Sequence, residues 1–286
     1  MSDDIEAARK FFAEEVCFVA RVGDPRILAA FAKVPREEFL GPGPWRIVGA
    51  GPRMRAGYWT TPDANPRHLY HDVLVALVEA EGVNNGQPSL YAGFLRELTI
   101  GVGETVVHVG AGTGYYSALL GELVGPSGKV VAIEVDPALA EKARAALQPW
   151  PRVEVVVGNA LETELPPVDA ILASAGLTFP PANWLRALKT GGRLLVPLTT
   201  RARDGRALLV IRPRRDCASY VANFSTGVAF IDCLGARDPA LEGKLAAAFA
   251  RKGGDAVKSL RMDAHAEDSS CWLHAAGWCL SKREPG

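Results

Sequence analysis

Between residues 101 and 198, short apolar runs rich in β-branched residues alternate with segments of helical character. This alternation constrains the fold more than any other feature of the chain. The pattern predicts strands at 106–109, 129–133, 153–157, 169–173 and 193–196, and helices at 115–124, 137–147 and 183–189. Strands that are apolar throughout are typical of a parallel sheet covered by helices on both faces. We therefore expect an α/β protein with a doubly wound, mainly parallel sheet.

The segments on either side of this region have a different residue pattern. Apolar positions at helical spacing up to Lys33, broken at Gly23-Asp24-Pro25, predict two N-terminal helices. Residues 41–66 are rich in proline and glycine, which predicts a functional loop or lid and excludes a regular helix. After Thr199 the predicted elements are strands at 207–211, 227–233 and 271–280 and a helix at 239–251.

We expect these parts to form a single domain of residues 1–286. It would consist of an N-terminal cap of helices and loops (1–95), a cofactor-binding core (96–200) and a β-rich extension (201–286). The extension is expected to continue the same sheet. The apolar tail from Cys271 to Leu280 is predicted to be a buried closing strand pair, with a dimer contact as the alternative.

The charge balance disfavours one class of partner. Lys plus Arg and Asp plus Glu both number 32, so the net charge is zero and no excess positive field attracts phosphate. The basic run Arg212-Pro213-Arg214-Arg215 is interpreted as a solvated loop after a strand. No apolar run approaches the ~20 residues that span a bilayer. We therefore expect neither a nucleic-acid nor a membrane partner.

The cysteines indicate a reducing compartment. The chain has 5 of them, an odd number without a Cys-x-x-Cys pair, so neither a metal site nor a disulfide framework is expected. The acidic N-terminus lacks the features of a signal peptide. We expect reduced thiols in a cytoplasmic protein.

A glycine-rich loop, Gly110-Ala111-Gly112-Thr113-Gly114, joins the first predicted core strand to its helix. Ligands of open α/β sheets bind beyond the carboxyl ends of the strands, where such loops lie. Glycine allows a positive φ angle and lets a ligand approach the backbone. Tyr115 stands where a dinucleotide fingerprint requires its third glycine, which disfavours a nicotinamide dinucleotide.

Residues at the ends of the next two strands predict an adenosine site. Glu134 follows the glycine loop by about 20 residues, the distance at which an acidic residue binds ribose hydroxyls. Asp136 is the competing carboxylate, but it precedes Pro137 and is expected to cap a helix. In Asn159-Ala160-Leu161, the amide can bond the adenine edge and the apolar residues can pack on the ring. Each of these three also fits a tight turn.

Several motifs in one order carry a family resemblance. They are Val34-Pro35-Arg36-Glu37-Glu38-Phe39, Tyr70-His71-Asp72, Gln87-Pro88, residues 106–120, and Leu188-Lys189-Thr190-Gly191-Gly192-Arg193-Leu194. The chain resembles the protein-L-isoaspartate O-methyltransferase family from about Phe31 to Leu198, with a weaker similarity at Val228-Ala229-Phe230-Ile231. The resemblance implies a seven-stranded-type Rossmann-like sheet and S-adenosyl-L-methionine as cofactor. It also implies O-methylation of a carboxylate on isoaspartyl or related aspartyl sites of proteins or peptides.

The chain departs from the family pattern at two places. The family usually carries Thr-Ile-Ser before its x-Pro, with the serine hydroxyl near the substrate, whereas Asn84-Asn85-Gly86 precede Gln87-Pro88 here. Gly86 thus stands in the place of the serine. The acidic residue usual in the first strand is His108, which we interpret as a histidine at the edge of the core with one nitrogen hydrogen-bonded.

Methyl transfer from a sulfonium mainly requires positioning and exclusion of water, and an ionised carboxylate acceptor needs no general base. We expect the acceptor to be positioned by Asn84, Asn85, Gln87 and Ser89. Residues 84–91 would form the wall between cofactor and acceptor, with the loop 45–59 closing over it. Tyr91 equally fits plain helix packing. The change Asn85→Ala is predicted to lower turnover while sparing cofactor affinity.

Three other hypotheses stay open on the sequence. The acceptor can be a different peptide or a small molecule, because residues 84–86 differ from the family pattern. The chain can also be a non-catalytic module that binds S-adenosylmethionine, or a nicotinamide oxidoreductase, which Tyr115 disfavours. Both a monomer and a homodimer are compatible with the pattern.

Overall fold

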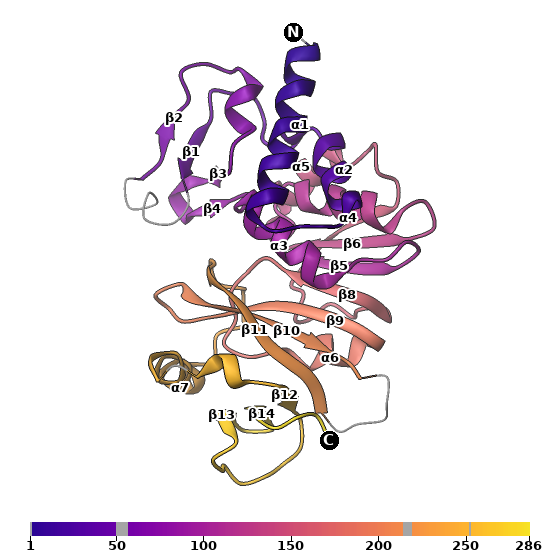
Figure 1. Cartoon of the computed structure of the whole chain (residues 1–286). Coiled ribbons are helices and arrows are strands. Elements are labelled where there is room, and N and C mark those ends of the chain that lie inside the picture. The colour runs from indigo at the N-terminus through magenta and orange to yellow at the C-terminus, as the bar shows by residue number, and fades with distance from the viewer. Residues whose placement is uncertain (1, 50–56, 214–218, 252) are drawn as a thin grey trace. The chain divides into compact units, whose positions relative to one another are not determined.

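The computed structural model describes residues 2–49, 57–213, 219–251 and 253–286 (Figure 1). They pack as two compact units. Unit 1 comprises Met1–Glu104 and Ala111–Gly158, and unit 2 comprises Thr105–Gly110 and Asn159–Gly286. The chain passes from unit 2 back to unit 1 between Gly110 and Ala111, within the glycine loop.

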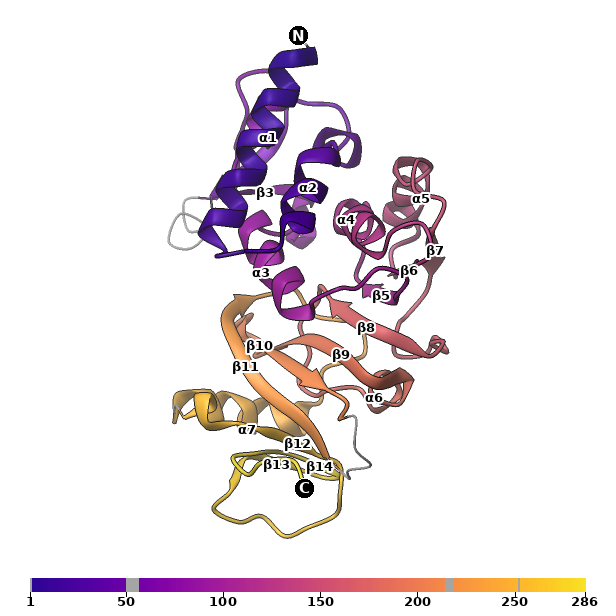
Figure 2. The same ribbon diagram turned by 45° about the vertical axis from the view of Figure 1, so that its right-hand side comes forward.

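Three helices form the N-terminal part of unit 1: α1 (Ser2–Val19), α2 (Pro25–Lys33) and α3 (Pro88–Leu98). The predicted break between the first two is confirmed. The Asp24 side chain accepts a hydrogen bond from the Arg26 N–H, and Pro25 takes the first helical position. Helix α1 packs beside α2, as Figures 1 and 2 show, with the ring centroids of Phe12 and Phe31 6.1 Å apart.

A small antiparallel sheet follows in unit 1, with strand order β2-β1-β3-β4. Its strands are β1 (Arg46–Gly49), β2 (Trp59–Thr60), β3 (Val73–Val78) and β4 (Val83–Asn84). The predicted loop at 41–66 is therefore corrected, because it contributes two strands. Ile47 in β1 and the adjoining Trp45 are buried against Leu69 and Val75, whereas β2 is exposed and is held by its pairing with β1. Residues 50–56 of the predicted lid lie outside the described residues.

The remaining part of unit 1 is an α/β segment close to the prediction. It contains α4 (Tyr115–Val124), β6 (Lys129–Glu134), α5 (Pro137–Ala146) and β7 (Val153–Val157). Strands β6 and β7 are parallel, as expected for strands joined by a helix. Asp136 caps α5 by accepting hydrogen bonds from the N–H groups of Ala138 and Leu139, so its predicted N-cap role is confirmed.

Unit 2 is built on a sheet in which the strands follow the order β13-β14-β12-β11-β10-β9-β8-β5. The parallel strands are β5 (Thr105–Val109), β8 (Val168–Ala173) and β9 (Leu188–Thr199). The antiparallel extension comprises β10 (Asp204–Ile211), β11 (Ser219–Ala229), β12 (Ser259–Arg261), β13 (Cys271–Ala275) and β14 (Trp278–Ser281). Its helices are α6 (Ala182–Ala187) and α7 (Pro239–Ala250), and α7 packs against β13 (Figure 2). The predicted α/β class with a C-terminal β-rich extension is confirmed.

Some predicted boundaries are wrong. Helix α6 ends at Ala187 and not at Lys189, because Leu188 already pairs with Val168 in the parallel register of β9 and β8. The strand predicted at 227–233 is β11, which begins at Ser219 and ends at Ala229. Arg214 and Arg215 of the predicted basic loop lie outside the described residues.

Short 3-10 turns complete the elements: η1 (Arg36–Phe39), η3 (Pro66–Leu69), η4 (Glu79–Glu81) and η5 (Gly254–Ala256). None of the helices in the described part of the chain is long and apolar enough to cross a membrane. The tail predicted as a strand pair is the hairpin of β13 and β14. The single-domain organisation of residues 1–286 stays a prediction.

Candidate cofactor site and acceptor segment

The glycine loop has a backbone that only glycine adopts readily. Gly110, Gly112 and Gly114 have φ angles of +73°, +57° and +96°. A Cβ atom on Gly114 would lie 2.8 Å from a methyl group of Leu147. The N–H of Ala111 donates to the carbonyl of Ile133 over 3.1 Å, which fixes the loop against β6. The loop thus lies at the end of a strand, where ligands of such sheets bind, and Gly114 is required there by the packing of Leu147.

Glu134, at the end of β6, holds this loop through its carboxylate. One oxygen accepts the N–H of Gly112 at 2.7 Å and the other accepts the N–H of Asp136 at 3.0 Å. The side chain is only 6% exposed. Burial raises the pKa of Glu134, because desolvation outweighs the hydrogen bonds from Asp136 and Gly112. Each carboxylate oxygen has a second lone pair, so Glu134 can also accept a hydrogen bond from a ligand hydroxyl.

Asn159, Ala160 and Leu161 form a turn at the start of the second segment of unit 2. The Asn159 side chain accepts the N–H of Leu161 at 3.0 Å and donates to Glu162 at 3.0 Å. Ala160 is buried, and its carbonyl accepts the indole N–H of Trp184 at 2.9 Å. The side-chain amide of Asn159 therefore stabilises the turn, and its binding role stays a prediction.

Asp72 organises the segment before α3. Its carboxylate accepts hydrogen bonds from the Gln87 amide at 2.8 Å, from the Ser89 hydroxyl at 2.6 Å and from the Ser89 N–H at 2.8 Å. The structure thus brings together two of the predicted positioning residues. Asp72 itself was not predicted as a site residue, although it belongs to the motif Tyr70-His71-Asp72.

The two asparagines of this segment shape its backbone. Asn85 is 8% exposed, and its side-chain oxygen accepts the Val75 N–H at 2.9 Å and the Arg36 guanidinium at 3.3 Å. Asn84 accepts the N–H of Gly86 at 2.9 Å. These contacts favour a structural role for Asn85. A lower turnover of Asn85→Ala would then report a disturbed fold and would not identify an acceptor contact.

Gly86 lies under an aromatic pair. Its φ angle is +77°, and a Cβ atom there would lie 2.4 Å from the Tyr91 ring. Tyr91 stacks on Tyr116 with ring centroids 3.5 Å apart, and the Tyr116 hydroxyl donates to the Gly86 carbonyl at 3.2 Å. Tyr91 is 3% exposed and packs α3 against α4, so it has a packing role, and its place in a wall beside the acceptor stays a prediction. The stack occupies the space into which a side chain at position 86 would extend.

Comparison with known proteins places these features in a family. The model of the protein-L-isoaspartate(D-aspartate) O-methyltransferase family matches residues 60–237, which include the acceptor segment, the glycine loop, Glu134 and Asn159. The protein-L-isoaspartate O-methyltransferase of Aeropyrum pernix is 31% identical over 230 residues, covering 75% of this chain and 78% of that protein. Enzyme 1 of the same name from Rhodopseudomonas palustris is 34% identical over 208 residues, covering 69% and 73%.

The chain belongs to this family.

Solved structures agree on the fold of the methyltransferase. A protein-L-isoaspartate O-methyltransferase superposes with a TM-score of 0.64 at 26% identity, covering 83% of this chain and 69% of that one. A Plasmodium falciparum structure described as a putative member, in complex with S-adenosyl-L-homocysteine, superposes with a TM-score of 0.61 at 16% identity, covering 79% and 97%. The Rossmann-like methyltransferase fold predicted from the sequence is thus confirmed.

A side chain at Gly86, where the family usually has serine, is expected to destabilise this methyltransferase. Gly86→Ala should lower the free energy of unfolding by about 2–3 kcal/mol, because it adds a positive-φ strain to a clash with the Tyr91 ring. Urea denaturation measures the change. Gly93→Ala in α3 is the matched control, since a Cβ there meets nothing within 4 Å. Equal stability of both variants would contradict the packing argument.

His108, the second departure from the family pattern, lies in β5 and is 1% exposed. Its Nε2 atom is 2.9 Å from the Ser174 hydroxyl. Burial lowers the pKa of His108 to about 3, so the imidazole is neutral at physiological pH. The predicted hydrogen-bonded nitrogen is confirmed, whereas the ring lies within the core and not at its edge.

Proposed function

We propose that this chain transfers a methyl group from S-adenosyl-L-methionine to a carboxylate on isoaspartyl or related aspartyl sites of proteins or peptides. The observation that carries the proposal is the family match over residues 60–237, within which the glycine loop is bonded to Glu134. The sulfonium cofactor supplies an activated methyl group and a neutral leaving group. We place the activity in the cytoplasm, without a nucleic-acid or membrane partner and with the chain as a monomer or homodimer.

The cofactor would be held by residues 110–115, Glu134 and residues 159–161. The glycines of the loop put no side chain between its backbone and a ligand, and Glu134 would accept a ribose hydroxyl with its remaining lone-pair capacity. Of Tyr115 only the main chain is suited to contact the ligand, because its ring is 2% exposed and packs against Phe31 and Phe39. Ala160 and Leu161 would pack on the adenine, and Asn159 would bond its edge.

The acceptor carboxylate is ionised at neutral pH, so the chain needs to orient it and exclude water, and no base is required. In this proposal Gln87 and Ser89 are the positioning residues, held in place by Asp72. Asn84 and Asn85 maintain the backbone that leads to them. The three hydrogen bonds accepted by Asp72 compensate its charge, which limits repulsion of an incoming carboxylate.

One observation favours a second candidate function, methylation of a different peptide or small-molecule acceptor. Tyr91 fills the space where the family's serine side chain would extend, so the acceptor meets backbone and an aromatic pair there. Such a surface differs in shape and polarity from one that presents a hydroxyl.

The test is transfer of a labelled methyl group to an isoaspartyl peptide, beside the same peptide with ordinary aspartate. Base-labile label on the isoaspartyl peptide alone is expected, since a carboxyl methyl ester hydrolyses in base. Glu134→Gln serves as the background control. Absence of label on both peptides, together with measured binding of S-adenosylmethionine, would reject isoaspartyl activity and leave another acceptor or a non-catalytic sensor.

A further inference from the structure

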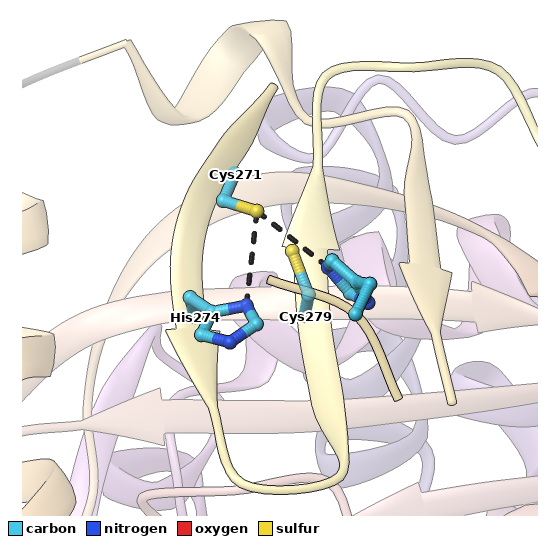
Figure 3. Close-up of side chains that lie close together, drawn as sticks. Cys271, His274 and Cys279 are labelled. Atoms are coloured by element: carbon cyan, nitrogen blue, oxygen red, sulfur yellow. Dashed lines mark hydrogen bonds between the residues drawn. The ribbon is translucent and has the colours of Figure 1, made fainter. Parts of the chain in front are cut away.

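The C-terminal part of unit 2 gathers four side chains of metal-binding type: His265, Cys271, His274 and Cys279. One ligand atom from each lies within 4.8 Å of all the others. The Cys271 sulfur is 3.6 Å from Nε2 of His265 and 3.7 Å from Nδ1 of His274. Figure 3 shows Cys271 and His274 on one strand of the hairpin and Cys279 on the other, with their side chains turned toward one another.

The hairpin register explains how three of the four share a face. His274 pairs directly with Cys279, and Cys271 pairs with Ser281, two residues beyond Cys279. Paired residues of antiparallel strands point to the same face, as do residues two apart. Cys271 and His274 are three apart and would alternate in a regular strand. The irregularity between Cys271 and Leu273 removes this alternation, as a β-bulge does.

Two distances within the cluster match the edges of a tetrahedral site. Zinc binds thiolate sulfur at about 2.3 Å and imidazole nitrogen at about 2.0–2.1 Å, which makes a tetrahedral sulfur-to-nitrogen edge ~3.6 Å long. The two measured edges are 3.6 Å and 3.7 Å. A cluster of thiols and imidazoles joined only by hydrogen bonds would account for each of these two contacts separately. It would not require one ligand atom from each of four side chains to gather within 4.8 Å of the others.

The contacts around His265 favour a ligand role. Its Nδ1 atom is 3.0 Å from the backbone carbonyl of Asp263, so Nδ1–H donates there and Nε2 keeps its lone pair toward Cys271. Asp263 is itself fixed by Arg261, whose guanidinium donates to both carboxylate oxygens at 3.0 and 2.6 Å. The imidazole is thereby oriented from outside the cluster, as metal-binding histidines are.

We propose that these four residues bind one Zn²⁺ ion. Two thiolates and two neutral imidazoles fill a tetrahedral shell without an open position, which makes the site structural and not catalytic. The ion would fasten the irregular stretch 262–270 to the β13–β14 hairpin. This revises the expectation that the chain has no metal site. That expectation rested on Cys-x-x-Cys spacing, whereas the ligands here follow the order His-x5-Cys-x2-His-x4-Cys.

The test measures metal directly in the full chain, purified without a histidine tag. Elemental mass spectrometry is expected to find about one zinc per chain, as a closed four-ligand site binds. Cys271→Ser and Cys279→Ser should each reduce the zinc to background. Cys233→Ser, a buried cysteine of the same unit outside the cluster, is the matched control and should retain it. Loss of zinc from the control alone, or retention in both cluster variants, would overturn the proposal.

A second readout avoids reliance on variants that fail to fold. Replacement of the metal of the wild-type chain by Co²⁺ should give the visible absorption of a tetrahedral ion and a thiolate charge-transfer band. The proposal is wrong if the chain, with its thiols reduced, contains no zinc and gives no such spectrum. A Cys271–Cys279 disulfide, found by non-reducing peptide mass spectrometry in freshly purified protein, would also overturn it. None of these readouts depends on the methyl acceptor.

Discussion

Replacing Glu134 with glutamine is expected to weaken binding of S-adenosylmethionine by about 100-fold, or ~2.7 kcal/mol. The carboxylate accepts the N–H groups of both Gly112 and Asp136. Glutamine keeps the shape but has one oxygen, so its amide N–H must face one of these backbone donors. In the proposed site the variant also replaces charge-assisted hydrogen bonds to the ribose with neutral ones, and charged acceptors bind about twice as strongly. Both losses fall on the loop proposed to contact the cofactor.

Calorimetric titration with S-adenosylmethionine measures this change, and urea denaturation reports whether the fold survives. Asp136→Asn is the matched control, because Asp136 lies two positions further on and asparagine caps helices as well as aspartate does. Its affinity and stability should match the wild type. A Glu134→Gln variant that binds within threefold of the wild type, or an equal loss in Asp136→Asn, would contradict the ribose role.

Protonation should mimic the glutamine variant. Burial raises the pKa of Glu134, so the carboxylate gains its proton at a higher pH than an exposed glutamate does. Wild-type affinity is therefore expected to be full at neutral pH and to fall as the pH drops through this raised pKa. The affinity of Glu134→Gln should stay flat over the same range. Parallel titrations from pH 7 down to about pH 4.3, the ordinary pKa of glutamate, measure the two affinities.

The central elements were predictable because their signals are local. Helix α4 begins at Tyr115, directly after the glycine loop, and α5 begins at Pro137 after its cap Asp136. The short strands β1 and β2 were not predictable from their own residues. Strand β1 is held because Trp45 and Ile47 pack against Leu69 and Val75, which lie more than twenty positions away in the chain, and the exposed β2 pairs with β1. A residue pattern within a short stretch of sequence does not reveal packing partners that lie so far apart in the chain.

The same distinction applies to the candidate site. The glycine loop and Glu134 follow from residue types at known offsets along one α/β unit. The contacts of Asp72, and the convergence of His265 on the hairpin, join residues whose pairing depends on the path of the backbone. The sequence alone also placed Asn85 among the acceptor contacts. Its bonds to Arg36 and Val75 became visible only with the fold.

Replacing Arg36 with leucine is expected to lower the free energy of unfolding by about 4 kcal/mol, which places the change among severe single substitutions. Arg36 is completely buried. Its guanidinium donates to the carbonyls of Leu69 at 2.5 Å, His71 at 3.1 Å and Val73 at 2.7 Å. Leucine cannot donate to any of them, and the loss of a donor to a buried carbonyl costs ~1–3 kcal/mol. The Leu69 bond is buried and the other two are partly buried, while the His71 carbonyl also accepts the Val73 N–H. Thermal and urea unfolding measure the effect.

Arg144→Leu is the control for removing an arginine, because Arg144 is exposed on α5, where its contacts are an ion pair with Glu141 and a long 3.5 Å hydrogen bond to the Val155 carbonyl. It should change stability by less than ~0.5 kcal/mol. Equal effects in the two variants would contradict the argument. Arg36→Lys tests the functional consequence, since one ammonium reaches fewer carbonyls than the guanidinium fork. The His71 and Val73 carbonyls flank Asp72, so a folded Arg36→Lys enzyme should lose methyl-transfer rate while its affinity for S-adenosylmethionine stays unchanged.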